Sequence, residues 1–188
     1  MKKVLLSVNP KWVAKICNKI GERDGKPIYE KRVEVRKTKP KAKTPFTVLI
    51  YETMGRTETP FVDEEGHHIF KGRGQVIGEF VCDRIYDLRY LPNEYYGKPS
   101  GTFEEFICES SCLSFDDIKA YGNGKNILGW HISDLVIYDK PRELSEFWTI
   151  KCTNKKGACG ECKAKPNCIK PITRPPQSWL YVEDREWT

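Results

Sequence analysis

Histidine is scarce in this chain, which has three histidines among its 188 residues. His67 and His68 are neighbours in a polar stretch, where such pairs usually lie on the surface, and His131 stands alone in an apolar stretch. The glycine-rich phosphate loop and the dinucleotide fingerprint are also missing, and no nucleophile signature marks a serine hydrolase. These absences argue against P-loop nucleoside triphosphatases and against dinucleotide-dependent enzymes.

Long apolar runs are missing as well. The first apolar stretch stops at Val8, where Asn9, Pro10 and Lys11 follow, so it is too short for the core of a secretory signal. No other run is long enough to cross a bilayer. We therefore expect a cytosolic, cytoplasmic protein, whose cysteines must be explained in a reducing compartment.

Charge is what the chain has in abundance. Charged residues make up 31% of it, apolar residues 39%, and the formal net charge is +6. A basic balance favours an anionic partner, although a mildly basic surface without such a partner explains it equally well. The length suits one domain over residues 1–188, and recurrent aromatic and β-branched residues are sufficient for one compact core.

The spacing of apolar residues indicates strands more often than helices. We predict a first helix that begins at Pro10, with Asn9 as its N-cap, and a second that begins at Ser114 and ends at Asn123. A short helix is expected at 141–147. Predicted strands cover 2–8, 28–37, 46–52, 75–88, 127–138 and 178–183, with a hairpin or excursion at 57–74. Strands joined by turns, with few helical crossovers, argue against a doubly wound parallel sheet, so we predict an α+β, mostly β fold: a small, partly open β-barrel with one or two packed helices.

Four of the eight cysteines crowd into one polar stretch, in the pattern C-x6-C-x2-C-x5-C. Such a stretch has too few apolar residues to build a core, and a tetrahedral zinc ion bound by four thiolates would order it. Disulfides fit poorly without a secretion signal, and free buried thiols fit poorly in a polar segment. We predict a structural zinc knob over residues 149–171, with the ligands Cys152, Cys159, Cys162 and Cys168.

The stretch from Lys31 to Lys37 is the most informative in the chain. Glu34 stands between Arg32 and Arg36 on one strand face, where the guanidinium groups keep its carboxylate ionised. Arg36 offers a planar fork that suits a phosphate or a base edge. A solvated strand face is also consistent with these residue types.

Two tryptophans leave a choice between base stacking and core packing. Trp130 lies in a predicted strand, and Trp179 follows an approach that Pro175 and Pro176 hold stiff. Either ring is therefore a candidate for the rim of a binding cleft.

The basic stretch resembles the ASCH domain family, whose signature has the form G-x-K-x-x-E-x-R just after the first helix. This chain has Lys31, Glu34 and Arg36 at the K, E and R positions, after its own predicted first helix. The segments Val-Leu-Leu-Ser-Val-Asn-Pro before that helix, Gly-Glu-Phe-Val at 78–81 and Arg-Pro-Pro-Gln-Ser-Trp at 174–179 are also similar to the family. The resemblance covers the chain apart from the cysteine knob.

The chain departs from the family immediately before the signature lysine. Tyr29 stands where the signature has glycine, and the stretch 22–30 is longer than the turn usual in the family. This extra stretch would displace Lys31 from the pocket that its counterpart lines, whereas the strand fixes Glu34 and Arg36.

The resemblance implies a PUA-like barrel with a cleft beside the signature strand, a fold associated with RNA binding. Some ASCH proteins hydrolyse RNA, and some very small members remove the acyl group from acetylated cytidine. Those amidohydrolases have threonine at the position of Glu34, so their proposed nucleophile is absent here.

Three hypotheses follow. The first is an RNA- or nucleoside-binding protein, which would use Arg32, Glu34, Arg36, Lys37, Trp130 and Trp179. The second is a hydrolase acting on RNA or on an acylated nucleoside, in which Lys31 lowers the barrier electrostatically and Glu34 acts as general base on water. The third is a protein-interaction module that docks through the zinc knob.

Overall fold

The structure is a computed structural model that describes residues 3–58, 69–91, 94–96, 103–150 and 169–183. It is mostly β, with three α-helices in the described ranges. The chain divides into two compact units, each assembled from separated stretches. The first unit comprises Met1–Pro10, Thr47–Glu79 and Val136–Thr188, and the second comprises Lys11–Phe46 and Phe80–Leu135. None of the helices in the described ranges is long and apolar enough to cross a membrane.

A five-stranded sheet in the order β12-β8-β5-β1-β15 supports the first unit. Its bounds are β1 (Lys3–Val8), β5 (Phe46–Glu52), β8 (Val76–Cys82), β12 (Ser133–Arg142) and β15 (Trp179–Val182). β1 runs parallel to β5 and antiparallel to β15. The strand predicted at 46–52 is confirmed as β5, and every one of its residues is buried. The core of this unit consists of Leu5, Leu49, Tyr51, Val76, Leu144, Phe147, Ile172 and Val182.

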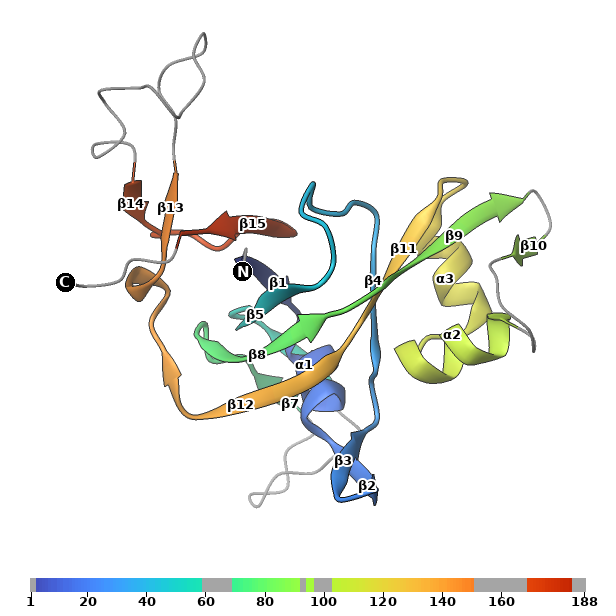
Figure 1. The fold of residues 1–188 in the computed structure, drawn as a ribbon, viewed down its shortest axis with the longest axis horizontal. Coiled ribbons are helices and arrows are strands. Elements are labelled where there is room, and N and C mark those ends of the chain that lie inside the picture. The colour runs from blue at the N-terminus through green and yellow to red at the C-terminus, as the bar shows by residue number, and fades with distance from the viewer. Residues whose placement is uncertain (1–2, 59–68, 92–93, 97–102, 151–168, 184–188) are drawn as a thin grey trace, which may run out of the picture. The chain divides into compact units, whose positions relative to one another are not determined.

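Short elements complete the first unit. They are β6 (Arg56–Glu58), β7 (Ile69–Lys71), the 3-10 helix η1 (Leu144–Glu146), β13 (Trp148–Ile150) and β14 (Ile169–Pro171). β13 and β14 pair antiparallel, so residues 150 and 169 meet at the base of the predicted zinc knob (Figure 1). Residues 151–168, which include the four predicted ligands, lie outside the described residues. A single domain over 1–188 with a knob at 149–171 therefore stays a prediction.

The second unit has a four-stranded sheet in the order β10-β9-β11-β4. Its elements are α1 (Pro10–Cys17), β2 (Lys19–Arg23), β3 (Lys26–Tyr29), β4 (Val33–Arg36), β9 (Ile85–Leu91), β10 (Glu94–Tyr96), α2 (Phe103–Ser111), α3 (Phe115–Gly122) and β11 (Ile127–His131). Figure 1 shows α2 and α3 next to β9 and β11. The core between these helices and the sheet consists of Val33, Val35, Leu88, Ile107, Ile118 and Ile127.

The ends of α3 follow the capping rules that predicted them. The Ser114 side chain accepts a hydrogen bond from the Asp117 amide, and the Asp117 side chain accepts one from the Ser114 amide, which is a capping box. Asn123 ends the helix in the left-handed conformation, with a φ of 49°. The predicted helix from Ser114 to Asn123 is confirmed.

Other boundaries differ from the prediction. The expected strand at 75–88 is two strands, β8 and β9, and the expected strand at 127–138 is also two, β11 and β12. Asp134 has a φ of 46° just after the second break, a conformation that interrupts regular pairing. α2 was not predicted, because its sequence Phe-Glu-Glu-Phe-Ile-Cys-Glu-Ser-Ser has no cap signal that marks it.

The main difference from the sequence prediction concerns the barrel. Among the described residues, neither large sheet closes on itself, since the strand orders run from β12 to β15 and from β10 to β4. β12 passes close to β8 at Gly78. A Cβ atom there would lie 2.4 Å from the carbonyl oxygen of Val136, so only glycine permits this approach of β12.

Candidate functional site

The three charged residues of the signature meet on one face of β4. Oε2 of Glu34 lies 3.3 Å from Nζ of Lys31, and Oε1 of Glu34 lies 2.8 Å from Nη2 of Arg36. Lys31 is 2% exposed and Glu34 is 5% exposed. One carboxylate therefore joins two cations in a nearly buried group, which we call the ion cluster (Lys31, Glu34 and Arg36).

Strand alternation places this cluster. Successive side chains of a strand point to opposite faces, so Val33 and Val35 enter the core while Glu34 and Arg36 face the other way. β11 pairs antiparallel with β4 and sets Trp130 directly opposite Glu34. Because directly opposed residues share a face, the indole of Trp130 lies on the same side as the Glu34 carboxylate.

Lys31 reaches the cluster in spite of the extra stretch before it. Residues 19–29 form the hairpin β2–β3, which we call the basic hairpin, turning at Asp24 and Gly25 with φ values of 51° and 72°. Two positive φ values are typical of the tight turns that close such hairpins. After the hairpin the chain comes back to α1, and the Lys31 amide donates a hydrogen bond to the Lys15 carbonyl there. The extra stretch therefore does not keep Lys31 from Glu34, and its displacement from the pocket that its family counterpart lines stays a prediction.

The ammonium group of Lys31 has two further neighbours in this unit. Nζ donates to the carbonyl oxygen of Ser111 at 2.7 Å, and it lies 5.0 Å from the ring centre of Trp12. Ser111 is the last residue of α2, where the helix dipole is negative. Lys31 thus caps α2 and is enclosed by a carboxylate, a helix end and an aromatic face.

The exposed side of the cluster includes a residue that the sequence did not single out. Tyr121 on α3 is 39% exposed, and Nζ of Lys37 lies 4.9 Å from its ring centre. Burial raises the pKa of Tyr121, and the charge of nearby Arg36 partly offsets this. Tyr121 lies three residues after the buried Ile118, a spacing that could have placed it near the sheet.

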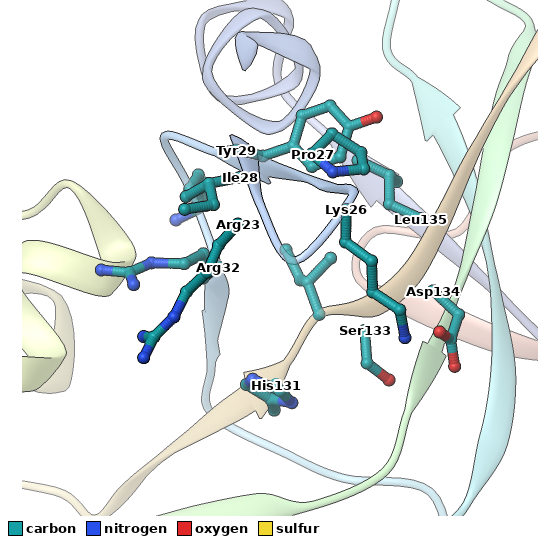
Figure 2. Close-up of a pocket in the computed structure, with 12 residues that line it drawn as sticks. Arg23, Lys26, Pro27, Ile28, Tyr29, Arg32, His131, Ser133, Asp134 and Leu135 are labelled. Atoms are coloured by element: carbon teal, nitrogen blue, oxygen red, sulfur yellow. The ribbon is translucent and has the colours of Figure 1, made fainter. Parts of the chain in front are cut away.

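A cavity of about 590 Å³ lies on the other side of Lys31, within the second unit. Figure 2 shows its lining, to which the basic hairpin and the junction of β11 with β12 contribute. Lys31 and Arg32 line it, whereas Glu34 and Arg36 are not among its lining residues. The signature strand therefore has a cavity beside it, as the cleft hypothesis requires.

A histidine of this cavity is paired with an acid. Nδ1 of His131 lies 2.5 Å from Oδ1 of Asp83, and Nη2 of Arg84 lies 3.2 Å from Oδ2 of the same carboxylate. Burial acts to raise the pKa of Asp83, but the hydrogen bonds and positive charges of His131 and Arg84 outweigh it, so that pKa is lowered. Forty-eight residues separate the two partners, so no local sequence pattern indicates the pair.

The structure buries Trp130 in the second unit and places Trp179 in the first. Trp130 is 0% exposed and packs edge-on against Phe46, with ring centres 5.6 Å apart, so its ring is a core group. Trp179 belongs to the first unit, on β15, where it packs edge-on against Tyr181. Within the described ranges no group of three or more His, Cys, Asp or Glu side chains could hold a metal. The four predicted zinc ligands lie outside those ranges.

No protein-family model matches the chain, and no curated protein matches it either. Among solved structures, an ASCH protein from Zymomonas mobilis is similar, with a TM-score of 0.53 and 17% identity over 97% of this chain and 88% of that one. Two variants of that protein give a TM-score of 0.51 and 15% identity, over 97% of this chain and 89% and 91% of theirs. The chain has an ASCH fold.

The ASCH fold agrees with the α+β, mostly β class predicted from the strand pattern. At these identities the likeness concerns the fold alone, so the roles of individual residues must be argued from their own geometry. Three features supply that geometry: the ion cluster, the exposed Tyr121 ring beside it, and the cavity lined in part by Lys31.

Proposed function

We propose that this protein binds RNA or a nucleoside through a surface formed by Arg36, Lys37 and Tyr121, which we call the β4 surface. The observation that carries the proposal is the bond between Glu34 and Arg36. It holds the guanidinium group in one place while leaving 12% of the Arg36 side chain exposed. A guanidinium fork that is fixed before binding loses little entropy when it engages a phosphate or a base edge.

Lys37 extends the positive charge of this surface. Its ammonium group lies over the Tyr121 ring, and the exposed residues Lys39, Lys41 and Lys43 follow in the next loop. The only acid of the cluster, Glu34, is turned inward and is neutralised by two cations. A polyanion approaching β4 therefore meets positive charge and little repulsion.

The same geometry favours binding over hydrolysis at Glu34. A general base must present a free lone pair to the water that it activates. Each oxygen of Glu34 is already paired with a cation, and because the residue is 5% exposed, water has little access to its remaining lone pairs. Glu34 is therefore suited to positioning Arg36 rather than to abstracting a proton.

Removing the Lys37 charge is expected to weaken RNA binding and to change its salt dependence. For a fluorescein-labelled single-stranded RNA of about 12 nucleotides, the slope of log affinity against log salt should fall by about 0.7 in Lys37→Ala. Arg36→Ala should weaken binding about 5- to 100-fold. Fluorescence anisotropy at several salt concentrations measures both quantities.

Lys119→Ala is the matched control for these variants. Lys119 is exposed on α3, and it lies two residues from Tyr121, so it faces roughly the opposite way on the helix. The Lys119→Ala variant removes one positive charge, as Lys37→Ala does, and should leave RNA affinity within about twofold of the parent. Equal losses in Lys37→Ala and Lys119→Ala would show that the charge acts non-specifically and that the β4 surface is not the site.

We also propose that Cys152, Cys159, Cys162 and Cys168 bind one structural zinc ion, in a protein of the reducing cytosol. The pairing of β13 with β14 supports this, because it closes the base of the segment that holds them. Elemental analysis should return about one zinc per chain, and Cys159→Ser with Cys162→Ser should abolish it. Protein free of zinc that keeps its thermal stability would contradict the proposal.

A further inference from the structure

The cavity beside Lys31 has a lining that the β4 surface does not share. It is formed by the basic hairpin and by the residues that link β11 to β12, whereas Arg36, Lys37 and Tyr121 do not line it. The basic hairpin therefore forms one wall of this cavity.

Charge in the cavity is strongly one-sided. Four cationic residues line it, and Asp134 is the single acidic one. Lys31 is already engaged by Glu34, and Arg32 by Glu109 at 2.9 Å. In the described part of the chain, the Lys26 side chain has neither a hydrogen bond nor an ion pair, and the Arg23 side chain has only a distant ion pair of 3.9 Å with Asp24. Uncompensated cations in a cavity favour an anionic ligand.

The shape of the cavity indicates more than a bare anion. Its volume of about 590 Å³ falls in the range of small-molecule sites. Apolar groups from both sides form its floor, namely Pro27, Ile28, Tyr29, Ile132 and Leu135. In Figure 2, Arg23 and Arg32 project to one side of the basic hairpin and Lys26 projects to the other, on the side of Ser133 and Asp134. Such a lining suits a ligand with a flat, weakly polar body and an anionic end.

His131 adds a directed polar group. The Asp83 carboxylate holds Nδ1, so the ring cannot turn and Nε2 is the nitrogen left to meet a ligand. Ser133 is fixed as well, because its hydroxyl donates to the Val81 carbonyl at 2.8 Å. The polar rim is therefore formed in advance, as is usual for ligand sites.

We propose that this cavity binds a nucleoside 5′-monophosphate, with the phosphate at Lys26 and the nucleoside over the apolar floor. The monophosphate has two sources, a free nucleotide and the 5′-phosphorylated end of an RNA chain, and both present the same phosphate monoester. The site is separate from the β4 surface and stands whether or not that surface binds RNA.

Isothermal titration with AMP, CMP, adenosine and inorganic phosphate tests the proposal on the full chain. AMP and CMP should bind with saturation below about 1 mM, and adenosine and phosphate should each bind at least about 10-fold more weakly. Lys26→Ala should weaken AMP binding about 10-fold. Lys19→Ala is the matched control, since Lys19 lies on the same hairpin, pairs with Glu22 and does not line the cavity.

Competition distinguishes the two sources. RNA with a 5′ phosphate that displaces AMP, when the same RNA with a 5′ hydroxyl does not, identifies the RNA end as a ligand. Displacement by neither RNA identifies the free nucleotide. The effect of Lys26→Ala on AMP affinity is read independently of RNA binding, so failure of the β4 surface does not affect this result. No saturable AMP binding, adenosine binding as tight as AMP binding, or equal losses in Lys26→Ala and Lys19→Ala overturns the proposal.

Discussion

Replacing Glu34 with alanine is expected to lower the free energy of unfolding by about 3–5 kcal/mol. Glu34 is the only anion of the ion cluster, and its removal leaves Lys31, which is 2% exposed, and Arg36 close together without a counter-charge. Burying an uncompensated charge is costly because the surrounding protein cannot replace the water that solvated it. Urea denaturation followed by circular dichroism measures the loss.

The chain contains a matched control for this prediction. Lys19 and Glu22 form an ion pair with the same three-residue spacing and a similar distance of 3.0 Å, but both side chains are more than half exposed. Glu22→Ala should cost less than about 1 kcal/mol, because water solvates the remaining lysine. In addition, Lys31→Met combined with Glu34→Gln should recover part of the stability lost in Glu34→Ala. Equal costs for Glu34→Ala and Glu22→Ala would contradict the buried role of the cluster.

The part of the site that could be predicted from the sequence is the part that strand geometry dictates. Alternation along β4 set Glu34 and Arg36 on one face, and the structure joins them at 2.8 Å. Lys31 illustrates the limit of that argument. Its position depends on how the basic hairpin closes, and a hairpin that turns tightly at Asp24 and Gly25 absorbs the extra residues without moving the strand that follows.

Contacts between distant segments could not be predicted. Asp83 and His131 meet because β9 pairs with β11, and neither residue has a local pattern that indicates the other. Tyr121 reaches the ion cluster because α3 packs on the sheet through Ile118. Closure of a barrel is likewise a property of the whole strand order. The strand pattern predicted the class correctly, but it could not reveal that the sheets stay open in the described ranges.

The ion cluster and the cavity differ in how their charges are balanced, and apart from Lys31 they lie on different elements of the second unit. The ion cluster is nearly neutralised internally and buried, so it contributes to stability and fixes Arg36. The cavity instead carries exposed cations on a hairpin outside the main sheets, where Arg23 and Lys26 are solvated in the absence of a ligand. Substitutions in the basic hairpin can therefore change the lining of the cavity without disturbing β4, the strand that holds Glu34 and Arg36.

Trp130→Ala is expected to be the second severely destabilising substitution, costing about 3–5 kcal/mol of unfolding free energy. The indole is 0% exposed, packs edge-on against Phe46 and lies opposite Glu34 across β11 and β4. Alanine would leave a cavity and would also admit water beside the ion cluster. Trp179→Ala is the control, because Trp179 is only half-buried on β15 and should cost less. Urea denaturation of both variants gives the comparison.

The sequence left Trp130 as a candidate for either base stacking or core packing, and a milder variant separates these two roles. Trp130→Phe retains an apolar ring in the core, so it should fold and bind RNA within about twofold of the parent, because a ring without exposed surface cannot stack on a base. Anisotropy with the labelled RNA measures the affinity. Trp130→Phe protein that keeps its stability but loses RNA affinity would show that the ring becomes accessible when RNA binds. The β4 surface would then have to include β11.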